Sequence, residues 1–91
     1  MVSLRAILQP MEPSSTTLHL ERIDASRNMA RFYRLSVEPS LFGDAALVRE
    51  WGRIGTLGRR RLDLFADACL AGQALRRLSV AKLRRGYRDV G

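Results

Sequence analysis

Cysteine, histidine and lysine are almost absent from this chain, which contains one of each: Cys69, His19 and Lys82. A single cysteine cannot form an internal disulfide, so the fold needs no oxidising compartment. One histidine beside one cysteine is also too few for a Cys/His metal site. We therefore expect neither a metal nor any other cofactor.

Long apolar segments and a secretion signal are lacking as well. The apolar runs are short and interrupted by arginine, and residues 1–8 show no signal-peptide pattern. We expect a cytoplasmic protein that neither spans nor crosses a membrane. With 91 residues, of which 46% are hydrophobic, the chain suits one small folded domain and excludes a large enzyme.

Acidic residues are scarce in the second half of the chain. Residues 1–45 carry five arginines against five acids, whereas residues 46–91 carry ten arginines and Lys82 against four acids. The net charge of +7 therefore belongs to the second half, and a polyanion is the natural partner. Arginine binds phosphate bidentately and stacks on rings, although a GC-rich genome would produce the same bias. Composition alone leaves both explanations open.

Hydropathy patterning predicts an α+β domain. Period-2 alternation favours strands over residues 16–24, 31–38, 45–54 and 59–65, and the short connections between them make the strands antiparallel. Apolar residues at three- and four-residue spacing then predict a helix after Asp67 that ends near Gly86. Gly72, in the middle of this helix, indicates close packing on the sheet. Residues 1–15 are predicted to be a flexible tail before a domain of residues 16–91.

The most informative segment is Trp51-Gly52-Arg53-Ile54-Gly55-Thr56. It belongs to an ordered set that also contains Arg31-Phe32-Tyr33, Leu35, Val37, Phe65, Ala71, Leu75, Lys82 and Gly86-Tyr87. In this order and spacing, over roughly residues 17–88, the chain resembles a WGR domain. The resemblance implies a twisted antiparallel sheet of about four to five strands with one main α-helix packed on it.

The resemblance also implies a function. WGR domains occur in DNA-damage-activated poly(ADP-ribose) polymerases, where they bind DNA near a strand break, and in short stand-alone bacterial proteins. Carried over to this sequence, Trp51 would pack against a terminal nucleotide and Arg53 would lie at the surface that contacts DNA and neighbouring domains. ADP-ribosyl transfer is not implied, because the chain has no room for the catalytic domain. We expect a binding module and not an enzyme.

The strand of residues 45–54 offers two faces. The side of Ala46 and Val48 reads as the better core face, which would place Trp51 on the wetter side with Arg49 and Arg53. There, an indole beside guanidinium groups would suit a nucleotide end. The alternative is that Trp51 belongs to the core, as most tryptophans do in large part.

Three further cations are candidates for the same surface. Arg59 and Arg61 face the same way on the next strand and would widen a phosphate-binding surface, unless that strand is merely solvated. Lys82 would lay its stem on the core and extend its ammonium group to the rim, either for binding or only to reach water.

These patterns predict a nucleic-acid-binding module that favours DNA over RNA and contacts mainly phosphates. The rival interpretation is a protein-interaction module whose arginine-rich face meets an acidic partner. Sequence reasoning leaves open whether the ligand is a DNA end, a duplex or a single strand, and whether the chain forms oligomers.

Overall fold

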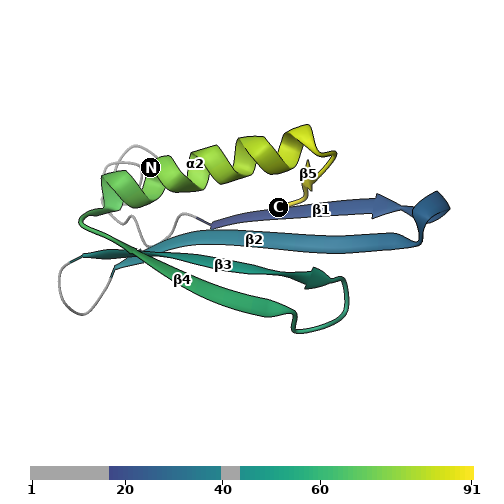
Figure 1. The fold of residues 1–91 in the computed structure, drawn as a ribbon, viewed down its shortest axis with the longest axis horizontal. Helices are drawn as coiled ribbons and strands as arrows, with labels where there is room; N and C mark the ends of the chain where they lie inside the picture. Colours follow the sequence, from purple (N-terminus) through teal and green to yellow (C-terminus); the bar gives the residue numbers. More distant parts are fainter. Residues whose placement is uncertain (1–16, 40–43) are drawn as a thin grey trace, which may run out of the picture.

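The computed structural model describes residues 17–39 and 44–91. They form a five-stranded antiparallel sheet with a long helix across one face (Figure 1). The elements in chain order are β1 (Thr17–Asp24), the 3-10 turn η3 (Ala25–Arg27), β2 (Met29–Pro39), β3 (Ala45–Arg53), β4 (Arg59–Phe65), α2 (Ala68–Arg84) and β5 (Arg88–Asp89). The predicted α+β class is confirmed. The flexible tail predicted for residues 1–15 lies outside the described residues.

The strands follow the order β4-β3-β2-β1-β5 across the sheet. Consecutive strands from β1 to β4 pair antiparallel, as the short connections between them predict. Helix α2 then carries the chain from β4 at one edge to β5 at the other, where β5 pairs with β1. The helix therefore crosses the sheet and covers one of its faces.

Local side-chain chemistry fixes the turns and the helix ends. Asp24 accepts a hydrogen bond from a backbone N–H within η3, and Asn28 follows with a left-handed φ of 52°. At the start of α2, Asp67 accepts a hydrogen bond from the Leu70 N–H at 2.9 Å. Gly86 has a φ of 100° just beyond the helix, which is the left-handed conformation that commonly ends helices. Both predicted helix boundaries are confirmed.

The loop between β3 and β4 requires glycine at position 58. Gly58 has a left-handed φ of 72°. A Cβ atom there would collide with the Trp51 carbonyl group and come within 2.9 Å of the Phe32 ring. The loop therefore packs closely on β2 and β3, and this fixes the end of β3 that carries Trp51.

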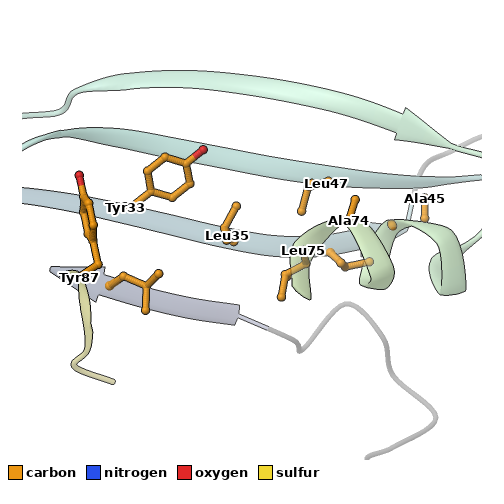
Figure 2. Packing of buried hydrophobic residues seen from close by; sticks show 10 residues of the cluster. Tyr33, Leu35, Ala45, Leu47, Ala74, Leu75 and Tyr87 are labelled. Carbon is orange, nitrogen blue, oxygen red and sulfur yellow. The ribbon is translucent and has the colours of Figure 1, made fainter. Parts of the chain in front are cut away.

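The hydrophobic core lies between α2 and one face of the sheet. Figure 2 shows Leu35 and Leu47, from neighbouring strands, on the same side as Ala74 and Leu75 of the helix. Leu20, Leu35 and Leu47 are the largest fully buried side chains of the described residues. Burial of these leucines is the main source of stability in a domain of this size.

The predicted core face of β3 is wrong. Helix α2 covers the side of Leu47 and Trp51, not the side of Ala46 and Val48. Ala46, Leu47 and Val48 are all buried, so alternation within β3 alone could not distinguish its faces. The register with β2 identifies the core face of β3, because it places Leu47 opposite Val37 on the apolar side of β2.

Gly72 does not pack closely on the sheet, contrary to the prediction. Apart from its chain neighbours and the backbone of α2, the one atom of the described residues that a Cβ atom at this position would meet within 4 Å is Nη1 of Arg76, at 3.7 Å. Packing therefore does not require a glycine in the middle of α2.

Candidate nucleic-acid interface

Chemically useful side chains gather in a groove at the C-terminal end of α2. Residues 17–39 and 44–91 contain no group of three or more His, Cys, Asp or Glu that could hold a metal ion. No helix in the same part of the chain is long and apolar enough to cross a membrane. The groove has a volume of about 290 Å³ and is lined by Arg31, Phe32, Tyr33, Trp51, Gly52, Arg53, Lys82 and Tyr87. We call it the aromatic groove.

Three aromatic rings form the apolar part of this groove. Tyr33 and Trp51 lie opposite each other on β2 and β3, with ring centroids 6.0 Å apart and an interplanar angle of 18°. Tyr87 meets Tyr33 edge-on, with centroids 6.4 Å apart. Figure 2 shows these two tyrosines at the end of the core that the labelled helix residues do not reach. Stacked and edge-on pairs fix the ring orientations, so the groove is preformed.

Trp51 is neither fully solvent-facing nor fully buried in the core, the two alternatives that the sequence left open. Its side chain packs against the hydrophobic core, yet the residue is only half-buried. The guanidinium carbon of Arg49 lies 5.8 Å from the indole centroid. Trp51 is thus anchored by Tyr33 on one side and keeps part of its surface accessible to a ligand.

Lys82, the one lysine of the chain, brings its ammonium group over two of these rings. Its Nζ lies 4.4 Å from the Tyr33 centroid and 5.3 Å from that of Tyr87, in the range of cation–π interactions. Partial burial lowers the pKa of Lys82, and the positive charges of Arg85, Arg49 and Arg31 lower it further. The cations in this region are therefore close enough to repel one another.

Arg49 and Arg61 share a carboxylate and are not free. Arg49 donates to the Tyr33 hydroxyl at 3.0 Å and to Asp63 at 3.3 Å. Arg61 donates to the other oxygen of Asp63 at 2.8 Å. Partial burial raises the pKa of Asp63, but the two guanidinium groups outweigh this effect and lower it overall. Arg49 therefore orients the Tyr33 ring in the groove, and Arg61 helps to hold the carboxylate that Arg49 shares.

Arg59 lies directly opposite Trp51 on the edge strand β4 and is exposed. The structure thus brings Trp51, Arg53 and Lys82 together in one groove and puts Arg59 beside it. Of the six predicted site residues, Arg49 and Arg61 are the two whose charges are already paired.

Sequence reasoning missed a second group of cations. Arg22, Arg31 and Arg53 pair in register on the neighbouring strands β1, β2 and β3, and we call them the arginine row. Arg53 donates to the backbone carbonyl of Asn28 at 3.4 Å, but no member of the row forms an ion pair with a carboxylate of residues 17–39 or 44–91. Counting charge by halves of the chain concealed the row, because two members belong to the neutral half. The cross-strand register of β1, β2 and β3, which sequence reasoning did not assign, was the signal that could have found it.

Comparisons with known proteins agree with this architecture. The family model for the WGR domain matches residues 16–91. "Uncharacterized protein y4dW" of Sinorhizobium fredii is 49% identical over 71 residues, which cover 78% of this chain but only 35% of that protein. No solved structure matched the chain. The resemblance stated from the motif is confirmed: the chain belongs to the WGR domain family, a family of nucleic-acid-binding modules.

Proposed function

We propose that this chain binds DNA at or near strand ends, with the aromatic groove as its ligand site. The observation that carries the proposal is the combination of a half-buried indole, fixed on Tyr33, with three groove cations that form no ion pair with a carboxylate among the described residues: Arg31, Arg53 and Lys82. A nucleotide end presents a flat sugar or base beside a phosphate, and this groove offers an apolar surface beside positive donors.

Each groove residue has a distinct role in this proposal. The accessible part of Trp51 covers the terminal sugar or base. Arg53 and Lys82 bind the adjoining phosphates, and Arg59 extends the positive surface along the edge strand. Arg49 and Arg61 act indirectly, because their bonds to Tyr33 and Asp63 hold the aromatic rings in place.

Such contacts predict affinity without marked base specificity. Phosphate contacts carry no sequence information, and stacking on an indole tolerates every base. Each phosphate contact releases counterions, so binding should weaken steeply as the salt concentration rises.

Fluorescence anisotropy with labelled oligonucleotides tests the proposal. We expect a linear duplex to bind more tightly than a closed circle of the same sequence, scrambled sequences to bind equally, and RNA to bind more weakly. Affinity should fall by about tenfold or more between low and moderate salt if several phosphates are contacted. Equal binding to linear and circular DNA would remove the preference for ends, and binding that does not change with salt would contradict the phosphate contacts.

A second candidate function is docking of an acidic protein on the outer face of α2. Arg76, Arg77 and Arg84 surround Val80 and Ala81 there, and this shallow surface is separate from the aromatic groove. Cations around an apolar centre suit an acidic partner with an apolar residue at its middle. Capture of such a partner should survive nuclease treatment and be lost in Arg77→Glu but not in Arg53→Ala. Loss of capture on nuclease treatment would leave nucleic acid as the ligand.

A further inference from the structure

We infer that the arginine row is a phosphate track: Arg53, Arg31 and Arg22 take successive phosphates of one nucleic-acid strand as it runs across β3, β2 and β1. This inference rests on the proposed function and deepens it, because it assigns a path and a direction. The strand would leave the aromatic groove beside Trp51 and cross the sheet toward the edge formed by β5.

The register provides the first argument. Arg31 is the cross-strand partner of both Arg22 and Arg53, so the three Cα atoms lie in one line perpendicular to the strands. Neighbouring strands are about 4.8 Å apart, which places the outer two members about 10 Å apart at the backbone. Long arginine side chains can spread beyond that distance, so a row of this length suits two or three consecutive phosphates.

Adjacency to the groove provides the second argument. Arg31 and Arg53 line the groove itself, and each lies two residues from a groove ring on the same face of its strand: Tyr33 follows Arg31, and Trp51 precedes Arg53. The row thus begins where a stacked terminal nucleotide would lie. Its next phosphates would meet Arg31 and then Arg22.

Backbone lies against both ends of the row, and neither end forms an ion pair within residues 17–39 and 44–91. Arg53 donates to the Asn28 carbonyl, and the side chain of Arg22 lies against Gly86 at the end of α2. A Cβ atom at Gly86 would come within 3.3 Å of the Arg22 Nε atom, so this glycine makes room for the guanidinium group. Such contacts orient a guanidinium without neutralising it.

The like charges of this region are the third argument. Arg31 and Arg53 are exposed, Arg22 is half-buried, and the positive charge of Arg31 also acts on Lys82. Other arginines of the same sheet are paired: Arg34 with Glu50 at 3.5 Å, and Arg61 with Asp63. A row of like charges raises the energy of the free protein, and a bound polyanion relieves that repulsion.

The experiment combines arginine variants with single neutral phosphates. A hairpin duplex with one free end is prepared as a series in which one linkage at a time is an uncharged methylphosphonate. Affinity for each member is measured for the wild type, Arg22→Gln and Arg31→Gln. Arg60→Gln is the matched control, because it removes the same charge from the opposite face, where Arg60 pairs in register with Glu50.

We expect Arg22→Gln and Arg31→Gln each to weaken binding about tenfold at low salt and to lower the salt slope by about one. Each should also abolish the effect of neutralising one particular linkage, and the linkage coupled to Arg22 should lie farther from the end than that coupled to Arg31. Arg60→Gln should change neither affinity nor coupling. Thermal melting of each variant checks that the fold is retained.

Several outcomes overturn the track. If the row variants weaken binding no more than Arg60→Gln does, only a diffuse positive field is present. If both row arginines couple to the same linkage, or in the reverse order, the proposed path is wrong. If the row variants bind normally while Trp51→Ala binds weakly, the track fails and the proposed function stands. If the wild type binds no duplex, both fail together.

Discussion

The two ends of the helix-covered face of the sheet differ, because one holds the hydrophobic core and the other the proposed binding groove. At one end, Leu35 of β2 and Leu47 of β3 are fully buried beneath α2. At the other end, the same two strands carry Arg31 and Arg53 on the same face. The strands and their pleat do not change between these ends, but the helix cover does. One sheet therefore supplies a core where α2 covers it and a charged groove where α2 runs out.

Tyr33 is the point at which these two ends meet. Its side chain is only 3% exposed and belongs to the hydrophobic core. The same ring stacks on Trp51, lies beneath the ammonium group of Lys82 and has its hydroxyl bonded by Arg49. The groove is therefore built on a core residue, and this explains how a small domain can hold exposed cations in fixed positions.

The largest expected effect is on stability, from Leu47→Ala at the covered end. Leu47 is 1% exposed, so the substitution should lower the free energy of unfolding by about 2–5 kcal/mol through lost burial and a cavity. Thermal or urea denaturation measures this loss. Leu64→Ala is the matched control, because Leu64 is 67% exposed and its truncation should change stability by less than about 0.5 kcal/mol. Equal losses for the two variants would contradict the assignment of the core face.

Trp51→Ala should affect both properties, because Trp51 lies at the boundary. Its side chain is half-buried, so we expect a loss of about 2 kcal/mol in stability, below the range for fully buried aromatics. We also expect the affinity for a DNA end to fall by about 1–3 kcal/mol, the usual contribution of a stacked base. Trp51→Phe, which retains a ring, should restore most of both losses. A variant Trp51→Ala that is as stable and binds as tightly as the wild type would refute its place in the site.

A smaller effect is expected from pH, through Lys82 in the groove. Its pKa is lowered by partial burial and by neighbouring arginines, so it loses its charge at a lower pH than a free lysine. Affinity for DNA should therefore decrease as the pH rises through that lowered value. In Lys82→Arg the charge persists, so the affinity should stay level over the same range. Identical pH profiles for the two proteins would show that Lys82 does not contact phosphate.

The same titration has a defined sign for stability. Between the lowered pKa of folded Lys82 and its ordinary value of 10.5, the unfolded chain binds the additional proton. This group therefore makes the folded protein relatively more stable as the pH rises through that window. As the pH rises through this window, the DNA affinity of the wild type should fall while its free energy of unfolding rises. Lys82→Arg should show neither change from this group, because its side chain keeps its charge.

Local patterns predicted the elements well because their signals are short-range. The turn at Asn28, the cap at Asp67 and the helix end at Gly86 all depend on the residue itself and its near neighbours. The core face of β3 could not be found in this way, since apolar side chains occupy both sides of it and only the pairing with β2 distinguishes them.

The candidate site was also predictable only in part, because some of its residues lie together in the sequence and others meet only across strands. Trp51 and Arg53 belong to the motif and were identified from it. The pairing of Arg49 with Asp63 depends on contacts between strands, and so does the convergence of Arg22 and Arg31 on the groove. Charge counted along the sequence cannot reveal such contacts, but a cross-strand register can.

The smallest expected effect is a gain in stability from Gly72→Ala, which changes the helix and leaves the groove untouched. Gly72 has helical backbone, and among the described residues outside that backbone its added Cβ would meet Arg76 Nη1 at 3.7 Å, an ordinary contact with a flexible side chain. Alanine in a helix interior is favoured over glycine by about 0.5–1 kcal/mol, so the melting temperature should rise by a few degrees. Gly86→Ala is the contrasting control: its left-handed φ of 100° disfavours alanine, and that variant should melt lower.

DNA affinity should be unchanged in Gly72→Ala, because the aromatic groove lies at the other end of α2. A stabilised variant with altered affinity would show that helix stability and the groove are coupled, and a destabilised variant would restore the original prediction of close packing at this glycine.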